Sequence, residues 1–364
     1  MKPNKNSLTT KNLRSIARGL VFVMLFLALY VVLSMVFTPK VDGEPGGMTN
    51  DITYSYRAES KNSVDVVFIG NSDVARGINP AQIYRDTGIT SVTVGPSAVD
   101  SEKVYDLLCD IQKYQSPKVI ALEVDCLYGA SNKYYKMITR EYNESQSSAA
   151  TIKDFLSETE DKIVSGLAFY WPVMKYHDRW STLSANDFSN LNGRYKYSAK
   201  GYMFTTERRG FKYGDEYMSE KTNSAKPLSD KSAAGFEKII AFCKENNIKL
   251  ALFAIPSGSS WTPQKHNGAV NLAQKYSLDF VDYNTDTFLL DNFSWLNDTK
   301  DGGNHMNYYG ATKVTAAYEK HLQSLFDLKP TALSADEQIV WQTDSDRFYN
   351  VILKTYEEEH FLRC

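Results

Sequence analysis

The sequence lacks several features that would assign it to a class of protein at once. Its 41 basic and 43 acidic residues leave a formal net charge of -2, and no block of Lys and Arg marks the part expected to fold. This balance gives no electrostatic basis for nucleic-acid binding, so nucleic acid is not an expected partner. No internal repeat is visible either.

Cysteine is scarce as well, and its spacing argues against one kind of metal site. None of the four cysteines (Cys109, Cys126, Cys243 and Cys364) belongs to a C-x-x-C pair, so a structural zinc site is not expected. A Cys109–Cys126 disulfide is conceivable if the domain lies outside the cytoplasm, but isolated cysteines in a long chain are more often buried thiols. We expect no metal and no organic cofactor.

One long hydrophobic run lies near the start of the chain. Leu20 to Thr38 carries no charge, Gly or Pro, and about 20 helical residues match a hydrocarbon core of about 30 Å. Five basic residues precede the run, which predicts a cytoplasmic tail (1–18), a transmembrane anchor (19–38), a linker (39–60) and a main domain outside the cell. A cleaved signal peptide is the alternative, but the run exceeds a usual h-region and Ser34-Met35-Val36 is a poor cleavage site.

The rest of the chain, of ordinary globular composition, alternates between strand-like apolar runs and helical patterns. Such alternation predicts βαβ units and a three-layer α/β/α sandwich around a parallel sheet of about five strands. The predicted strands are Val64–Ile69, Ser91–Val94, Val119–Val124, Leu250–Ile255 and Phe280–Tyr283, and the predicted helices are Ser101–Gln115, Ala233–Asn246, Asn267–Tyr276, Ala311–Leu325 and, in the C-terminal part, Ser345–Glu358.

The interval between the third and fourth predicted strands is too long for a single crossover connection. It contains an aromatic cluster from Phe169 to Trp180, and we interpret residues 127–230 as an inserted subdomain or cap. The α/β domain then comprises residues 61–126 and 231–328, and residues 329–364 form a C-terminal extension.

A candidate nucleophile follows the first predicted strand. The β-forming run Val64–Ile69 ends abruptly in Gly70-Asn71-Ser72-Asp73, and Ile78-Asn79-Pro80 then opens a predicted helix. In open α/β sheets, ligands bind at the carboxyl ends of the strands, which is where Ser72 is expected to lie. The alternative is that Ser72 caps a helix, since Asn, Ser and Asp all do so.

A candidate base lies far along the chain. The stretch Asp298 to Ala311 places acids and His305 on a Gly-rich loop just before an amphipathic helix. Such a loop can bind the imidazole Nδ1–H to a carboxylate while Nε2 faces a serine hydroxyl, which is the geometry of a Ser-His-Asp triad. Ser72, His305 and an acid, Asp301 or Asp298, are therefore the candidate catalytic residues.

These stretches resemble the SGNH (GDSL-like) hydrolase superfamily, in its membrane-anchored extracytoplasmic branch. That branch includes proteins similar to alginate O-acetyltransferase subunits and to the lipoteichoic-acid D-alanylation protein that works beside a membrane-bound O-acyltransferase. Gly70-Asn71-Ser72-Asp73 matches the first block, and Asp301 to His305 matches the last Asp-x-x-His block with one extra residue. This spacing leaves the acid open between Asp301 and Asp298, of which Asp301 is preferred. Gly95 resembles the second block, which implies that its amide joins that of Ser72 in an oxyanion hole.

The third block of the family is missing. Where simple hydrolases carry an Asn after a Gly, this chain reads Glu123-Val124-Asp125-Cys126. An ionised carboxylate cannot donate a hydrogen bond to an oxyanion. The oxyanion hole then consists of two backbone amides alone, or it takes a third donor from Asn71 or from a residue of the inserted segment. The remaining alternative is that the protein does not hydrolyse small esters.

Three more residues are candidates for binding substrate. Arg76, near the strand edge, is either exposed or binds an anionic group. Asp125 either positions substrate or binds loop amides, and His177 either packs within the aromatic cluster or contacts a glycan.

The resemblance implies an extracytoplasmic serine acyltransferase or esterase acting on O-acyl, above all acetyl, groups of a cell-surface glycan or polymer. The implied partners are a membrane-bound O-acyltransferase, the polymer and the lipid bilayer. The competing expectation is a non-catalytic accessory or glycan-binding protein of the same system, and the preference for transfer rests on fold-level analogy.

Overall fold

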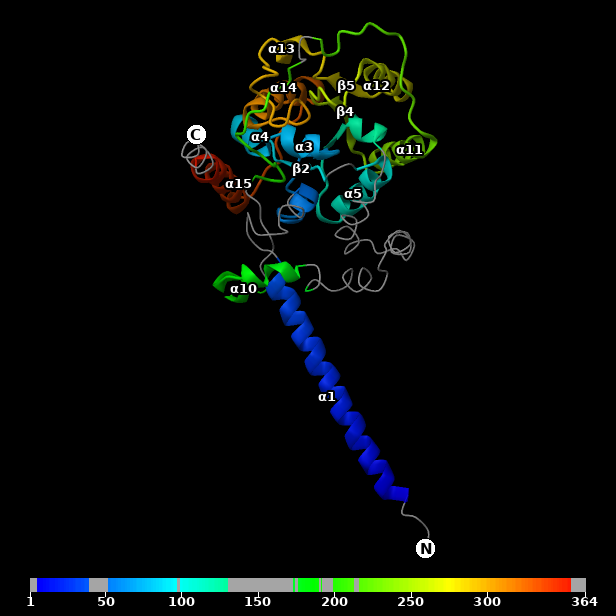
Figure 1. Ribbon diagram of the computed structural model, residues 1–364, viewed down its shortest axis with the longest axis vertical. Coiled ribbons are helices and arrows are strands. Elements are labelled where there is room, and N and C mark those ends of the chain that lie inside the picture. The colour runs from blue at the N-terminus through cyan, green and yellow to red at the C-terminus, as the bar shows by residue number, and fades with distance from the viewer. Residues whose placement is uncertain are drawn as a thin grey trace. The chain divides into compact units, whose positions relative to one another are not determined.

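The computed structural model describes residues 5–38, 52–96, 99–129, 173, 176–189, 191, 199–212 and 216–354 (Figure 1). The chain divides into two compact units, one of residues 1–47 and 156–195 and the other of residues 48–155 and 196–364. Residues 130–172 of the predicted insertion lie outside the described residues, so the predicted boundaries at 127 and 230 stay predictions.

The first unit is dominated by α1 (Lys5–Phe37), which contains the predicted hydrophobic run. Residues Asn12–Phe37 contain an 18-residue window with a mean hydropathy of 2.9 and are long and apolar enough to cross a membrane. The buried Arg179 lies in η3 (His177–Ser181), and its guanidinium donates to the Phe37 carbonyl at the end of α1 and to Asp187 in α10 (Ala185–Ser189).

The second unit is built on a five-stranded, all-parallel sheet in the order β2-β1-β3-β4-β5, which confirms the predicted architecture. Val66 of β1 pairs with Ser91 of β2 on one side and Val119 of β3 on the other. The central strands are buried throughout because helices cover both faces. The strands are β1 (Val66–Ile69), β2 (Ser91–Val94), β3 (Val119–Glu123), β4 (Lys249–Ala254) and β5 (Asp279–Asp282).

Helices on the two faces of the sheet complete three layers (Figure 1). Val67 and Ile69 pack with apolar residues of α5, α11 and α12, whereas Val66 and Phe68 pack with those of α4 and α14. This alternation follows from the two-residue period of a strand. The helices of this unit are η1 (Ser55–Arg57), α3 (Ser72–Gly77), α4 (Pro80–Thr87), α5 (Ser101–Tyr114), η2 (Val124–Tyr128), α11 (Asp230–Glu245), α12 (Pro263–Tyr276), α13 (Thr287–Leu290), α14 (Tyr308–Phe326), α15 (Ala335–Arg347) and the π-helical turn η4 (Phe348–Ile352).

The three described cysteines are all free thiols. Cys126 and Cys243 are buried in the cluster that includes α5 and α11, and Cys109 is partly buried. The alternative of a Cys109–Cys126 disulfide is therefore wrong.

The C-terminal helix begins ten residues before its predicted start. Ser334 and Glu337 form a reciprocal capping box, in which each side chain accepts from the other residue's backbone amide, so α15 starts at Ala335 rather than at Ser345. The helix packs on α4, where the rings of Tyr84 and Trp341 lie 5.3 Å apart.

A buried cation ties α15 to the beginning of the second unit. The Nζ of Lys200 lies 2.7 Å from Glu59 Oε1 and 2.5 Å from Asp344 Oδ2, and 4.3 Å from the centroid of the Trp341 ring. The Lys200 side chain is only 2% exposed, so these two carboxylates replace its lost hydration. Segments 141 and 144 residues away from Lys200 in sequence are thereby held together.

Candidate active site

Ser72 is the first residue of α3 and directly follows the carboxyl end of β1. Asn71 caps the helix, since its side chain accepts from the Asp73 amide at 2.8 Å. A Cβ on Gly70 would come within 2.7 Å of Glu123 Cβ, so only glycine allows β1 and β3 to lie this close at the turn. The Ser72 amide is one of the four that a helix start leaves without an intrahelical acceptor.

The structure brings the three predicted catalytic residues together. Ser72 Oγ lies 2.9 Å from His305 Nε2, and His305 Nδ1 lies 2.6 Å from Asp301 Oδ2. Asp301 Oδ1 also accepts from the His305 backbone amide at 2.8 Å, so one carboxylate fixes both the ring and the main chain of the histidine.

The ionisation of Asp301 suits this arrangement. Burial alone would raise the pKa of Asp301, but the hydrogen bonds from His305, its charge and nearby Lys300 hold this pKa well below its usual range. An ionised Asp301 keeps the proton of neutral His305 on Nδ1, although Asn304 Nδ2 also lies 3.0 Å from that atom. Nε2 then presents its lone pair to the Ser72 hydroxyl.

Asp298, the alternative acid, is engaged elsewhere. Its Oδ2 accepts from the Ser294 amide at 2.6 Å and from Lys313 Nζ at 2.7 Å, and the residue is buried. Asp298 therefore anchors the loop rather than orienting His305.

The loop that carries His305 is fixed by a network that the sequence analysis did not identify. Asn307 caps α14 by accepting from the Gly310 amide, and its Nδ2 donates to the Asn297 carbonyl at 2.7 Å. Gly303 has a φ of +99°, and a Cβ there would lie 2.6 Å from Phe211 Cγ. The pattern Gly-Gly-Asn-His-Met-Asn before a helix was the signal for this loop, but its contacts with residues near Phe211 are not local in sequence.

The Gly95 amide, predicted to bind an oxyanion, already has a partner. It donates to the Ile52 carbonyl at 2.7 Å, and a Cβ at this position would approach the Asn71 carbonyl to 2.6 Å. Gly95 therefore allows close packing against the turn that carries Ser72, and its amide is available to an oxyanion only if the bond to Ile52 opens. Asn71 lies beside Ser72, partly exposed, and its Nδ2 has no hydrogen-bond acceptor within the described part of the chain.

Two of the other predicted binding residues are engaged in contacts of their own, and the third belongs to the first unit. The guanidinium of Arg76 donates to Met203, with Nη2 2.8 Å from its Sδ. Asp125 is buried and bound by Lys265 Nζ at 2.5 Å. His177 belongs to η3 of the first unit, and its side chain falls outside the described residues.

Two buried acids border the triad. Asp73 Oδ1 lies 3.9 Å from His305 Nε2, and it has no hydrogen-bond partner among the described residues. Burial raises the pKa of Asp73 to about 7. The charge of His305 acts to lower this pKa, and the charge of Asp125 raises it further. Burial and the charges of Asp125 and Asp73 likewise raise the pKa of Glu123 well above its usual range. The sequence predicts that Asp73 follows β1 and that Glu123 lies at the end of β3, but it does not predict that both carboxylates are buried close to each other.

The buried Asp73 gives a testable dependence of stability on pH. Between about pH 4 and pH 7 the unfolded chain loses the Asp73 proton while the folded protein keeps it, so the free energy of unfolding falls as the pH rises. We expect Asp73→Asn to lack this pH-dependent contribution to the free energy of unfolding. The free energy of unfolding of the variant, relative to that of wild type, should therefore rise from pH 4 to pH 7 and stay constant above pH 7. Urea unfolding of both proteins in detergent at a series of pH values measures this.

Replacing the exposed Asp346 by Asn controls for the loss of one negative charge. A difference between wild type and Asp73→Asn that stays constant over this pH range would contradict the raised pKa.

The described residues contain no group of three or more His, Cys, Asp or Glu side chains that could hold a metal ion.

Comparisons with known proteins find similar chains among solved structures alone. No protein-family model matches the chain, and no curated protein matches it. Among solved structures, the chain is similar to a crystal structure from Bacteroides fragilis NCTC 9343 that is described as a putative acylhydrolase, with 13% identity and a TM-score of 0.35, over 74% of this chain and 93% of that one. At this TM-score the likeness carries no argument about function, which rests on the site itself.

Proposed function

We propose that the protein is a serine acyltransferase or esterase that acts outside the cell on O-acyl groups, above all acetyl groups, of a glycan or other surface polymer. The observation that carries the proposal is the unbroken chain of contacts from Ser72 Oγ through His305 to Asp301, at 2.9 Å and 2.6 Å. A serine hydroxyl is a weak nucleophile until a positioned base takes its proton, and this chain supplies that base.

The geometry supports a two-step reaction. Ser72 Oγ attacks the acyl carbonyl while His305 Nε2 takes the hydroxyl proton, and His305 then returns this proton to the departing alcohol, leaving an acyl-Ser72 ester. A sugar hydroxyl or water next attacks that ester and gives its proton to His305, which passes it to Ser72 as the acyl group departs. The Ser72 amide and Asn71 Nδ2 are the donors proposed for the oxyanion, joined by the Gly95 amide once Ile52 releases it.

The proposed location follows from the N-terminal sequence. The apolar part of α1 is long enough to span a membrane, and the five basic residues before Leu20 favour a cytoplasmic N-terminus. The α/β unit would then face the cell surface, beside a membrane-bound O-acyltransferase as the proposed source of acyl groups.

A second candidate function is supported by the bond between Gly95 and Ile52. With that amide occupied and no Asn at the third block, the site has fewer oxyanion donors than a simple esterase. A non-catalytic accessory or glycan-binding role in the same system is therefore the alternative.

Covalent labelling distinguishes the acyltransferase or esterase function from the non-catalytic accessory role. We expect a fluorophosphonate probe to add once to the full-length protein in detergent, at Ser72, because His305 activates this hydroxyl. Intact mass measurement and peptide sequencing detect the adduct, and the Ser72→Ala variant serves as the matched control. Labelling equal in wild type and Ser72→Ala, or absent from the folded wild type, would favour the accessory role.

A further inference from the structure

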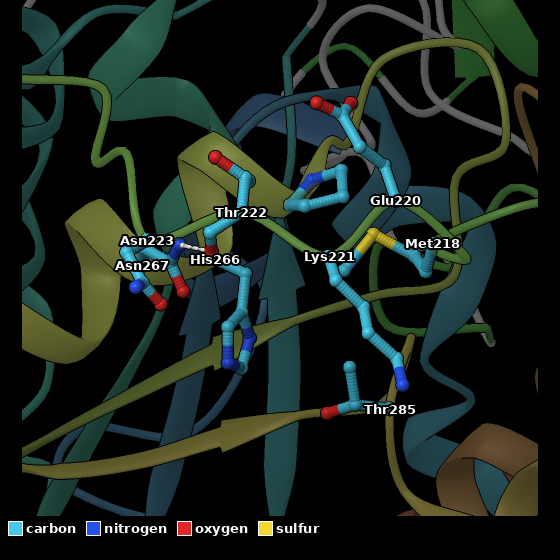
Figure 2. Close-up of a pocket in the computed structure, with 9 residues that line it drawn as sticks. Met218, Glu220, Lys221, Thr222, Asn223, His266, Asn267 and Thr285 are labelled. Atoms are coloured by element: carbon cyan, nitrogen blue, oxygen red, sulfur yellow. Dashed lines mark hydrogen bonds between the residues drawn. The ribbon is translucent and has the colours of Figure 1, made fainter.

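His266, the histidine of a second histidine–carboxylate pair, lines a hollow on the same α/β unit (Figure 2). The hollow has a volume of about 460 Å³ and lies between residues 218–223, the beginning of α12 and Thr285, which follows β5. Ser72 and His305 are not among its lining residues.

The His266 ring in this hollow is rigidly held. Its Nδ1 lies 2.6 Å from Asp282 Oδ2, which also accepts from Trp261 Nε1 at 2.9 Å. Asp282 Oδ1 accepts from both the backbone and side-chain nitrogens of Asn284, so the buried carboxylate cannot turn away. His266 Nε2 has no hydrogen-bond partner among the described residues, and its side chain is 28% exposed. It is a positioned group that can bind a ligand.

Positive charge gathers on one side of the hollow. In Figure 2 the His266 ring and the Lys221 ammonium extend in the same direction, with the Thr285 hydroxyl between their ends in this view, whereas the Glu220 carboxylate extends the opposite way. Both oxygens of Glu220 lie 3.3 Å from Gln264 Nε2, and no ion pair of Lys221 is found within the described part of the chain, where its side chain is exposed. The hydrogen bond with Asp282 raises the pKa of His266, against the effect of its burial.

The segment that carries Lys221 is fastened to α12. Asn267 Nδ2 donates to the Thr222 carbonyl at 2.8 Å and to the Ser224 carbonyl at 2.9 Å. The Lys226 amide donates to the Gln264 carbonyl at 2.7 Å. The backbone on both sides of the hollow is thus fixed before any ligand arrives, which lowers the cost of binding.

The hollow and the triad share one edge of the sheet. Asp282 is the last residue of β5, and Ser72 follows the carboxyl end of the parallel strand β1. Asn284 Oδ1 accepts from the Ser257 amide at 3.0 Å, and Ser257 Oγ donates to the carbonyl of Asn304, the residue before His305. A single molecule lying along this edge can therefore reach both places.

We propose that this hollow binds an oxyanion, a carboxylate or phosphate group, carried by the molecule whose ester is presented to Ser72. This inference rests on the proposed acyl-transfer function and adds that its substrate is anionic. A protonated His266 and the Lys221 ammonium are donors, and charge-assisted hydrogen bonds from them match either group. The Thr285 hydroxyl is not counted among the donors, because it donates to the Asp282 carbonyl at 3.1 Å.

Nuclear magnetic resonance of the histidine side chains in the full-length, detergent-solubilised protein tests this without relying on catalysis. At pH 6 we expect inorganic phosphate, acetate or both to shift the His266 ring signals in a saturable way, while sodium chloride of equal ionic strength does not. The charges that face His266 are Asp282, Glu220 and Lys221, so binding should weaken as the pH rises and His266 loses its proton. The His266→Gln variant assigns the signals.

Substitution of the exposed Lys221 provides the second arm. Lys221→Gln should weaken binding of the active probe about tenfold, because one charge-assisted hydrogen bond is lost. Lys226→Gln removes an exposed lysine of the same segment outside this hollow and should leave binding unchanged.

The outcomes separate this inference from the proposed function. Saturation by phosphate alone identifies a phosphate site, and saturation by acetate alone identifies a carboxylate site. No saturable shift with either probe, or equal effects of the two lysine substitutions, overturns the inference. Because Ser72→Ala should bind the probe as wild type does, failure of Ser72 labelling would count against the acyl-transfer function alone.

Discussion

Replacing Asp301 by Asn should lower kcat for p-nitrophenyl acetate hydrolysis by about 10⁴-fold, the loss that the same change causes in serine proteases with this triad. Asp301 accepts from the His305 ring and from its backbone amide, so Asn fits the space but can turn its NH₂ group toward Nδ1. The ring would then carry its proton on Nε2 and could no longer take the Ser72 proton. Steady-state kinetics of the full-length protein in detergent measure the effect.

Asp298→Asn is the matched control, because Asp298 lies on the same loop and was the alternative acid in the sequence. An Asn there can still accept from the Ser294 amide, so kcat should change only several-fold even though the contact with Lys313 weakens. If Asp298→Asn reduced kcat as strongly as Asp301→Asn, or if Asp301→Asn kept most of the activity, the assigned triad would be wrong.

Lys200→Met should lower the free energy of unfolding by about 3–5 kcal/mol, the usual cost of removing one partner of a buried ion pair. Lys200 is the shared cation of Glu59 and Asp344, and both carboxylates would remain buried without it. Urea unfolding in detergent, followed by tryptophan fluorescence, measures the change because Trp341 lies against the Lys200 ammonium.

The triple variant Lys200→Met, Glu59→Gln and Asp344→Asn separates the charge effect from the loss of packing. It should recover part of the lost stability, since no charge is then left buried. A Lys200→Met variant within 1 kcal/mol of wild type, or a triple variant less stable than the single one, would contradict this account.

The strands were predictable from the sequence because each is a short apolar run that ends in turn residues. The predicted limits of Ser91–Val94 are those of β2, and the other four strands differ from prediction by one or two residues at one or both ends. Parallel strands buried on both faces give continuous apolar runs, which differ clearly from the polar turn residues that follow them in the sequence. The order β2-β1-β3-β4-β5 was not predicted, since pairing depends on contacts distant in sequence.

Short helices and long-range polar contacts were the parts that sequence patterns did not reveal. Helix α3 spans only Ser72–Gly77, too few residues for a helical period, so Ser72 was placed after a strand but not at a helix start. Ser72, His305 and Asp301, which the structure brings into contact, could be picked out because strand-end serine and loop histidine are local patterns. The bond from Gly95 to Ile52 and the burial of Asp73 beside His305 depend on tertiary packing.

The contact between Ile52 and Gly95 determines where the chain can be shortened. Ile52 is the first described residue of the second unit, and the residues that follow it are part of the fold, since Ser55 Oγ donates to the Thr93 carbonyl and Tyr56 OH to Asp110. A soluble version of the α/β unit that starts after Tyr56 would lose all three contacts and free the Gly95 amide. Cleavage upstream of Ile52 would instead release the unit from its hydrophobic helix with this edge of the sheet intact.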